Sequence, residues 1–182
     1  VRHAGLARKI VPRSLRTWLK GFVPYGKVLT ERCRREGEAI LDAAARERPI
    51  RSEAAPEIGI VPDPLYYHVH HVLACHELNV PYRLVDIRGQ DWLEQLRSSG
   101  CRAFLIAPSA VYGFGRDMFD ERIAVMERDL GYRLVPRSDE LWLWEKKRRM
   151  AYWLAAHGVP HPRTRVFYDR EEARELLGSV DL

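Results

Sequence analysis

The sequence predicts an α/β fold: a mostly parallel, open sheet of about four strands with crossover helices, preceded by a basic helical leader. Three observations favour this class. From residue 57 onward, short apolar segments alternate with longer amphipathic ones, which is typical of βαβ units. Hydrophobic residues make up 46% of the 182 residues, enough for one core with an appendage. A polar, proline-flanked linker at 46–56 separates the two parts.

The leader, residues 1–55, carries all of the excess positive charge. It holds 13 Lys and Arg against six Asp and Glu, a charge of +7, whereas the remaining residues hold 17 against 19, a charge of −2. The net charge of +5 therefore says little about the ligand of the folded body.

Two helices are predicted in the leader. The second covers about Val28 to Arg46, and the first presents four apolar side chains at helical spacing with cations between them: Leu15, Trp18, Leu19 and Phe22. Residues 1–27 are expected either to lie on an anionic membrane surface or to pack on the body or on a partner. Nucleic acid is an unlikely partner, because no recognition motif accompanies the charge.

Four strands and three connecting helices follow the linker. Short apolar segments, rich in branched and aromatic residues, predict strands at Ile58–Val61, Tyr82–Ile87, Ala103–Ala107 and Tyr132–Val135. Longer amphipathic segments predict helices at Pro64–Leu78, Asp91–Arg97 and Asp117–Leu130, and Gly131 ends the last of these. Strands separated by helices of this length pair in parallel.

Candidate substrate contacts follow the strands, because ligands of open parallel sheets bind at the carboxyl ends of the strands. Asp63 follows the first strand, Arg88 the second and Ser109 the third. Asp63 and Ser109 are expected either to hydrogen-bond a carboxylate or amine substrate or to cap turns and helices.

A glycine-containing segment, Tyr112-Gly113-Phe114-Gly115, precedes Arg116. It lacks the third glycine of a dinucleotide-binding fingerprint, so we predict a flexible loop over the crevice. From this loop Arg116 would either face solvent or bind an anion. Asp120 and Glu121 are expected on the polar face of the following helix.

A histidine cluster raises the question of a metal. His68, His71 and Cys75 share one face of a helix. The outer two lie roughly 10 Å apart along a helix, too far to share one zinc ion with bonds of about 2 Å. The sequence therefore predicts no metal site, and buried or crevice-lining histidines instead.

The last 45 residues predict a helix, a sharp turn and a strand. Ser138 or Asp139 would cap a helix that continues through Leu154. Gly158 would close that helix in a left-handed conformation, and Pro160 and Pro162 would stop it from resuming. A strand at Thr164–Tyr168 follows, and then a helix with glutamates in its first turns.

Lys147 precedes Gly158 by eleven residues, and Gly158 begins the sequence Gly-Val-Pro-His-Pro-Arg-Thr. This pattern resembles the junction where the ATP-grasp superfamily passes from its N-terminal domain into its nucleotide-binding domain. The resemblance implies an N-terminal domain over 56–137, the start of a truncated ATP-grasp domain over 138–182, and contact between Lys147 and the ATP phosphates. Lys146 stands where the family usually has Asp, so Lys147 is chosen by its spacing to Gly158.

The resemblance also implies a function. ATP-grasp ligases activate a carboxylate as an acyl phosphate for attack by an amine-type nucleophile, with ATP and Mg²⁺ as cofactors. Their second lysine, glycine-rich loop and magnesium ligands would come after Leu182, so this chain alone is expected to be inactive. The alternatives are a non-enzymatic α/β binding module with a membrane- or partner-associating leader, and the nucleotide-sugar-binding half of a glycosyltransferase.

A cytoplasmic location is expected. The sequence has no run of 18 apolar residues, and its three cysteines are widely spaced and odd in number, which favours reduced thiols. The basic leader leaves open an association with the inner face of a membrane.

Overall fold

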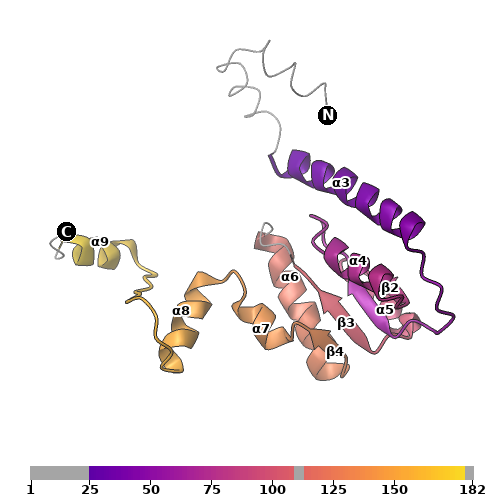
Figure 1. Cartoon of the computed structure of the whole chain (residues 1–182). Coiled ribbons are helices and arrows are strands. Elements are labelled where there is room, and N and C mark those ends of the chain that lie inside the picture. The colour runs from indigo at the N-terminus through magenta and orange to yellow at the C-terminus, as the bar shows by residue number, and fades with distance from the viewer. Residues whose placement is uncertain (1–24, 109–112, 179–182) are drawn as a thin grey trace, which may run out of the picture. The chain divides into compact units, whose positions relative to one another are not determined.

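The computed structural model describes residues 25–108 and 113–178. The chain divides into two compact units, Val1–Pro136 (unit 1) and Arg137–Leu182 (unit 2) (Figure 1). The predicted leader helix around Leu15 and Phe22, like Ser109, lies outside the described residues.

Unit 1 is built on a four-stranded, all-parallel sheet with the strand order β2-β1-β3-β4. The strands are β1 (Ile58–Val61), β2 (Tyr82–Leu84), β3 (Ala103–Ile106) and β4 (Arg133–Val135). Ile58 of β1 pairs with Tyr82 on one side and with Ala103 on the other. The predicted α/β class with a parallel open sheet is confirmed.

One helix of unit 1 precedes β1, and three more connect the strands in the described part of the chain. They are α3 (Tyr25–Glu47), α4 (Val69–Glu77), α5 (Trp92–Ser99) and α6 (Gly113–Ala124), and α6 continues into a π-helical turn at Val125–Asp129. Right-handed crossovers place α4 on one face and α5 and α6 on the other. The long helix α3 packs beside α4 (Figure 1).

The core follows the alternation of side chains along the strands. Ile60 packs with Val72 and Cys75 of α4 on one face, and Leu41 of α3 lies against this cluster. Phe104 of β3 is fully buried, and because side chains alternate along a strand it points to the opposite face from its neighbour Leu105. A Cβ atom at Gly59 would lie 2.3 Å from the Phe104 ring, so β1 needs a glycine there.

Strands β3 and β4 match their predicted ranges to within one residue, whereas β2 and α4 are clearly shorter than predicted. β2 ends at Leu84 instead of Ile87, because the Arg88 amide donates to the Asp86 side chain and turns the chain out of the ladder. Helix α4 begins at Val69 instead of Pro64, because Tyr66 has a left-handed φ of 62°, which no helix accommodates.

Helix α6 begins earlier than predicted. Gly113 and Gly115 are the first residues of the helix, so the prediction of a flexible loop at this segment is wrong. A glycine lowers helix propensity by only about 1 kcal/mol, which tertiary packing readily offsets. The early start places Arg116 inside the first turn of α6.

Unit 2 contains three helices, α7 (Ser138–Leu143), α8 (Lys147–Ala156) and α9 (Arg170–Gly178). The predicted single helix through Leu154 is wrong, because Glu145 adopts a left-handed φ of 57° and separates α7 from α8. The helix start is also displaced: Arg137 is the N-cap, and its amide donates to the Glu140 carboxylate at 2.8 Å.

The turn after α8 is partly as predicted. Gly158 has a φ of 63°, which confirms its left-handed conformation. The predicted strand at Thr164–Tyr168 is wrong: this segment pairs with no other strand in the described part of the chain. An extended segment becomes a strand only with a hydrogen-bonding neighbour, which its own sequence cannot supply. The glutamate-rich last helix is present as α9.

None of the helices within residues 25–108 and 113–178 is both long and apolar enough to cross a membrane.

Candidate functional site

A small cavity lies at the carboxyl ends of the central strands of unit 1. In the sheet order β2-β1-β3-β4, the chain passes from β1 to β2 on one side and from β3 to β4 on the other. Open α/β sheets bind ligands at such a point, between two neighbouring strands whose connections run in opposite directions. The cavity has a volume of about 60 Å³. Its lining comes from the segments after β1, β2 and β3 and from α6: Asp63, Pro64, Arg88, Pro108, Gly115, Arg116, Met118 and Phe119.

Asp63 is held in place by the turn that follows β1. Its side chain is buried, and its Oδ1 accepts a hydrogen bond of 2.8 Å from the Leu65 amide. The Asp63 amide in turn donates to His68 Nδ1 at 3.0 Å. The expected capping role is therefore confirmed, and the same turn fixes the Asp63 carboxylate in the wall of the cavity.

His68 supports this turn as a neutral imidazole. Because Nδ1 accepts the Asp63 amide, the ring proton resides on Nε2. Burial lowers the pKa of His68, with the charge of Arg88 acting in the same direction and the charge of Asp63 opposing it. Burial also lowers the pKa of the neighbouring His71.

Arg88 provides an exposed guanidinium in the lining of the cavity. Its Nε and Nη2 donate to the two Asp86 oxygens at 2.8 and 2.7 Å, and these bonds, helped by the charge of Asp63, raise the pKa of Arg88. Burial disfavours the Asp86 carboxylate, but the bonds from Arg88 outweigh that effect and lower its pKa. Arginine has five N–H donors, so those not engaged by Asp86 can reach a ligand.

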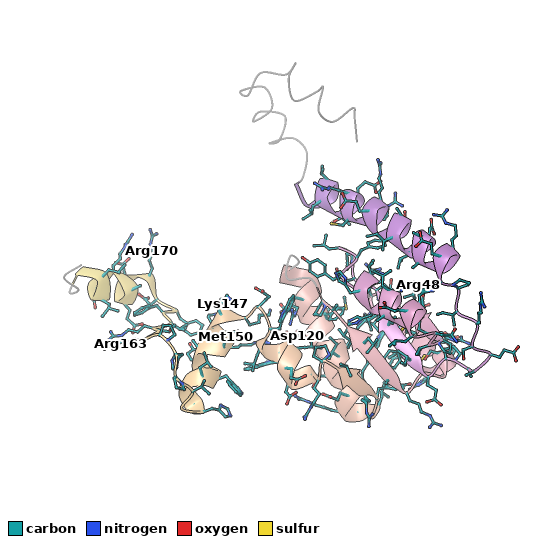
Figure 2. The ribbon with its side chains drawn as sticks, viewed as in Figure 1. Arg48, Asp120, Lys147, Met150, Arg163 and Arg170 are labelled. Atoms are coloured by element: carbon teal, nitrogen blue, oxygen red, sulfur yellow. The ribbon has the colours of Figure 1, made fainter. Side chains whose placement is uncertain are left out.

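Arg116 is a buried cation, which differs from the prediction of a solvent-facing side chain. It is 5% exposed, and its Nε donates to Asp120 Oδ1 at 2.7 Å. Asp120, labelled on α6 in Figure 2, was expected on the polar face, yet its side chain is only 15% exposed. Both corrections follow from the early start of α6. The i, i+4 spacing of Arg116 and Asp120 was the sequence signal for this pair.

The cavity therefore combines one buried carboxylate with two guanidiniums. The predicted contacts Asp63 and Arg116 both line it, together with Arg88, and Ser109 lies outside the described residues. Groups of both signs in one small cavity select ligands by charge and size.

The histidine cluster does not assemble into a metal site. Among residues 25–108 and 113–178, no three His, Cys, Asp or Glu side chains are grouped closely enough to hold a metal ion. Cys75 belongs to the core, where burial raises the pKa of its thiol.

A second candidate group of residues lies at the start of α8 in unit 2. Lys147 is the first residue of α8 and is exposed (Figure 2). Arg148 lies over the Tyr168 ring at 5.2 Å. Arg149 lies over the Trp142 ring at 4.5 Å and donates to the Trp142 carbonyl at 3.1 Å.

The start of α8 is strongly positive. Its first turn contains no acidic residue, and the helix dipole adds partial positive charge at this end. Cations are unfavourable there by themselves, and an anion bound to the helix N-terminus would relieve the repulsion. Lys147 forms no ion pair or ring contact with another described residue.

A scan against protein-family models found no matching family, and searches of curated proteins and of solved structures found no match.

Proposed function

We propose that this chain is the N-terminal portion of an ATP-grasp ligase, which activates a carboxylate as an acyl phosphate for attack by an amine-type nucleophile. One observation carries the proposal: a parallel α/β unit is followed by a helix that begins at Lys147 and closes at the left-handed Gly158. This order of elements resembles that of the superfamily.

The position of Lys147 supports contact with ATP phosphates. The first residues of a helix offer amide N–H groups without helical partners, and the dipole favours negative charge there. A lysine ammonium at the same end adds a compact, multiply donating cation on a flexible stem. Lys147 occupies the first helical position and is exposed.

The structure also bears on which of two lysines would contact the nucleotide. Lys146 is the N-cap residue, is half-buried, and already interacts with another residue. Lys147 is exposed and begins the helix. These differences support Lys147 as the phosphate-contacting side chain, which agrees with the choice made from its spacing to Gly158.

The cavity in unit 1 would bind a small substrate. Asp63 and Arg116, fixed by their own hydrogen bonds, would contact a carboxylate or amine substrate without costly reorganisation. Ser109 remains a predicted contact.

Magnesium does not fit the described residues. They contain no group of three or more potential ligands placed to hold an ion, whereas Mg²⁺ in phosphoryl transfer is held by carboxylates and phosphates. The proposal therefore assigns the metal ligands to protein outside these residues.

The exposed apolar surface of unit 2 supports the idea that further protein completes this unit. Neither α8 nor α9 buries a residue, and five aromatic side chains of the unit are exposed: Trp142, Trp144, Tyr152, Trp153 and Tyr168. Contiguous exposed apolar areas mark surfaces that other protein covers, and these side chains are the candidates for such a surface in unit 2.

An ATP titration of the chain tests the proposal. We expect saturable shifts of the amide NMR signals at the start of α8, and at least about a tenfold weaker affinity in Lys147→Ala, because one charge-assisted hydrogen bond is worth roughly 1.5–3 kcal/mol. Lys146→Ala is the matched control and should bind ATP like the wild type. If Lys147→Ala binds ATP as well as the wild type does, the non-enzymatic module becomes the better account.

A further inference from the structure

His68 joins the turn after β1 to helix α4. Its backbone carbonyl accepts the amides of His71 and Val72, so the residue is fixed to the first turn of the helix. Its ring lies in the turn after β1, where Nδ1 accepts the Asp63 amide at 3.0 Å. The residue is 3% exposed, so water cannot readily replace this hydrogen bond.

The turn that His68 closes also holds Asp63 in the wall of the cavity. Asp63 forms three hydrogen bonds in this turn: its amide donates to His68, its carbonyl accepts the Tyr66 amide at 2.8 Å, and its Oδ1 accepts the Leu65 amide at 2.8 Å. The first of these bonds depends on the protonation state of a histidine. The position of the Asp63 carboxylate is therefore linked to the His68 ring.

The bond between His68 and the Asp63 amide requires a neutral ring. A neutral imidazole has one donor nitrogen and one acceptor nitrogen, whereas an imidazolium has two donors and no acceptor. A proton taken up from solvent would place a hydrogen on Nδ1, directly opposite the Asp63 N–H. Two donors cannot form a hydrogen bond, and a buried amide without an acceptor is costly. The protonated ring is therefore incompatible with the closed turn.

The groups that face the ring come from the turn, from the segment after β2 and from α4. The Asp63 carboxylate attracts an imidazolium, the charges of Arg88 and of a protonated His71 repel it, and the Tyr66 ring lies 5.1 Å from the His68 ring. Burial is the largest effect and lowers the pKa of His68 below its ordinary value. The ring is consequently neutral at pH 7 and gains a proton only in more acidic solution.

From this geometry we infer that His68 is a pH-sensitive switch at the cavity. Its protonation breaks the hydrogen bond to the Asp63 amide and opens the turn, so that the Asp63 carboxylate leaves its fixed place in the cavity wall. Tyr66, which packs against Gly37 of α3, belongs to the same turn, so the opening also loosens the contact with α3. The switch lies within unit 1 and operates whether or not Lys147 binds ATP.

The test is amide hydrogen exchange of the whole chain, measured by NMR at pH 7 and pH 4.5 and corrected for the intrinsic pH dependence of exchange. The ¹⁵N signals of the His68 ring report its protonation in the same samples. We expect the ring to gain its proton between these pH values, and the protection of the Asp63 and Leu65 amides to fall at least about tenfold. The Ile60 amide, in the core strand β1, is the internal control and should keep its protection.

Two variants make the assignment to His68 specific. His68→Asn supplies an oxygen acceptor for the Asp63 amide that does not titrate, so the protection of this amide should be the same at both pH values. His70→Gln is the matched control, because His70 is exposed on the same helix, and this variant should respond to pH like the wild type.

Two results with the wild-type chain would overturn the inference, so the test does not depend on the folding of a variant. One is a His68 ring that gains its proton while the protection of the Asp63 amide is unchanged. The other is a ring that stays neutral at pH 4.5 in the folded chain. An equal pH response in the wild type and in His68→Asn would assign the opening to another group and would also contradict the inference.

Discussion

The ion pair of Arg116 and Asp120 is nearly closed to solvent, with side-chain exposures of 4% and 15%. We predict that Arg116→Met lowers the free energy of unfolding by about 3 kcal/mol, because it removes the cation that forms an ion pair with a poorly hydrated carboxylate. Chemical denaturation followed by circular dichroism measures the change.

The matched control for this prediction is Arg174→Met. Arg174 pairs with Glu171 at 2.6 Å, but both side chains are more than half exposed. Exposed pairs contribute about 0–1 kcal/mol, so this variant should unfold almost like the wild type. Equal effects of the two substitutions would mean that the Arg116 pair is not shielded from water.

Burial of two histidines makes stability depend on pH. Burial lowers the pKa of His68 and of His71, so the unfolded chain binds protons that the folded chain does not. The stability is therefore complete above the unfolded pKa of about 6.5 and falls as the pH drops below it, by at most about 1.4 kcal/mol per pH unit for each histidine.

Denaturation curves between pH 7 and pH 5 measure this slope. His68→Gln should flatten it, whereas His70→Gln, at an exposed position, should leave it unchanged. A slope that is identical in the wild type and in His68→Gln would show that His68 is protonated in the folded protein at these pH values.

At the residue scale, the sequence predicted which groups lie near the crevice but not how they are paired. Asp63 and Arg88 could be located because each follows a strand. The burial of Arg116 could not be foreseen, because it depends on where α6 begins, and two glycines in its first turn argue locally against a helix. The role of His68 depends on a backbone turn with a left-handed tyrosine, which sequence patterns do not reveal.

At the scale of elements, the contact between α3 and the turn after β1 depends on a glycine. A Cβ atom at Gly37 would lie 2.2 Å from Tyr66 Cδ1, and the Tyr66 hydroxyl donates to Glu38 at 3.3 Å. We predict that Gly37→Ala destabilises the protein by about 1–3 kcal/mol through overpacking. In an uncovered helix the same change would stabilise by about 1 kcal/mol, so the sign of the effect is decisive.

Two further variants make this test specific. Gly178→Ala on α9 meets no atom within 4 Å and should not destabilise, and Tyr66→Ala should relieve most of the added cost of Gly37→Ala. If Gly37→Ala raises the free energy of unfolding, then α3 does not pack on this turn.

Element types were more predictable than element ends. The first strand and the left-handed Gly158 could be predicted from local sequence. A short apolar run indicates a buried strand, and a glycine shortly before two prolines indicates the end of a helix. The break at Glu145 and the unpaired segment at Thr164–Tyr168 did not follow. Both depend on neighbours in space, and a strand in particular needs a partner that may be distant in sequence.

At the scale of the whole molecule, charge and burial are divided unequally between the parts. Most of the buried apolar residues belong to unit 1. Among the described residues of unit 2, one apolar side chain is buried, that of Leu141. The excess positive charge lies in residues 1–55, much of it outside the described residues. Composition predicted one good core with an appendage, but it could not reveal that unit 2 buries so little.

The most direct test of the ATP-grasp proposal is labelling with an acyl phosphate of ATP, which transfers its acyl group to a lysine amine held beside the phosphates. The chain has only five lysines, at positions 9, 20, 27, 146 and 147, so peptide mass spectrometry can follow every one. The account predicts preferential acylation of Lys147 and its suppression by excess ATP. Labelling of all five lysines to similar extents, without protection by ATP, would contradict it.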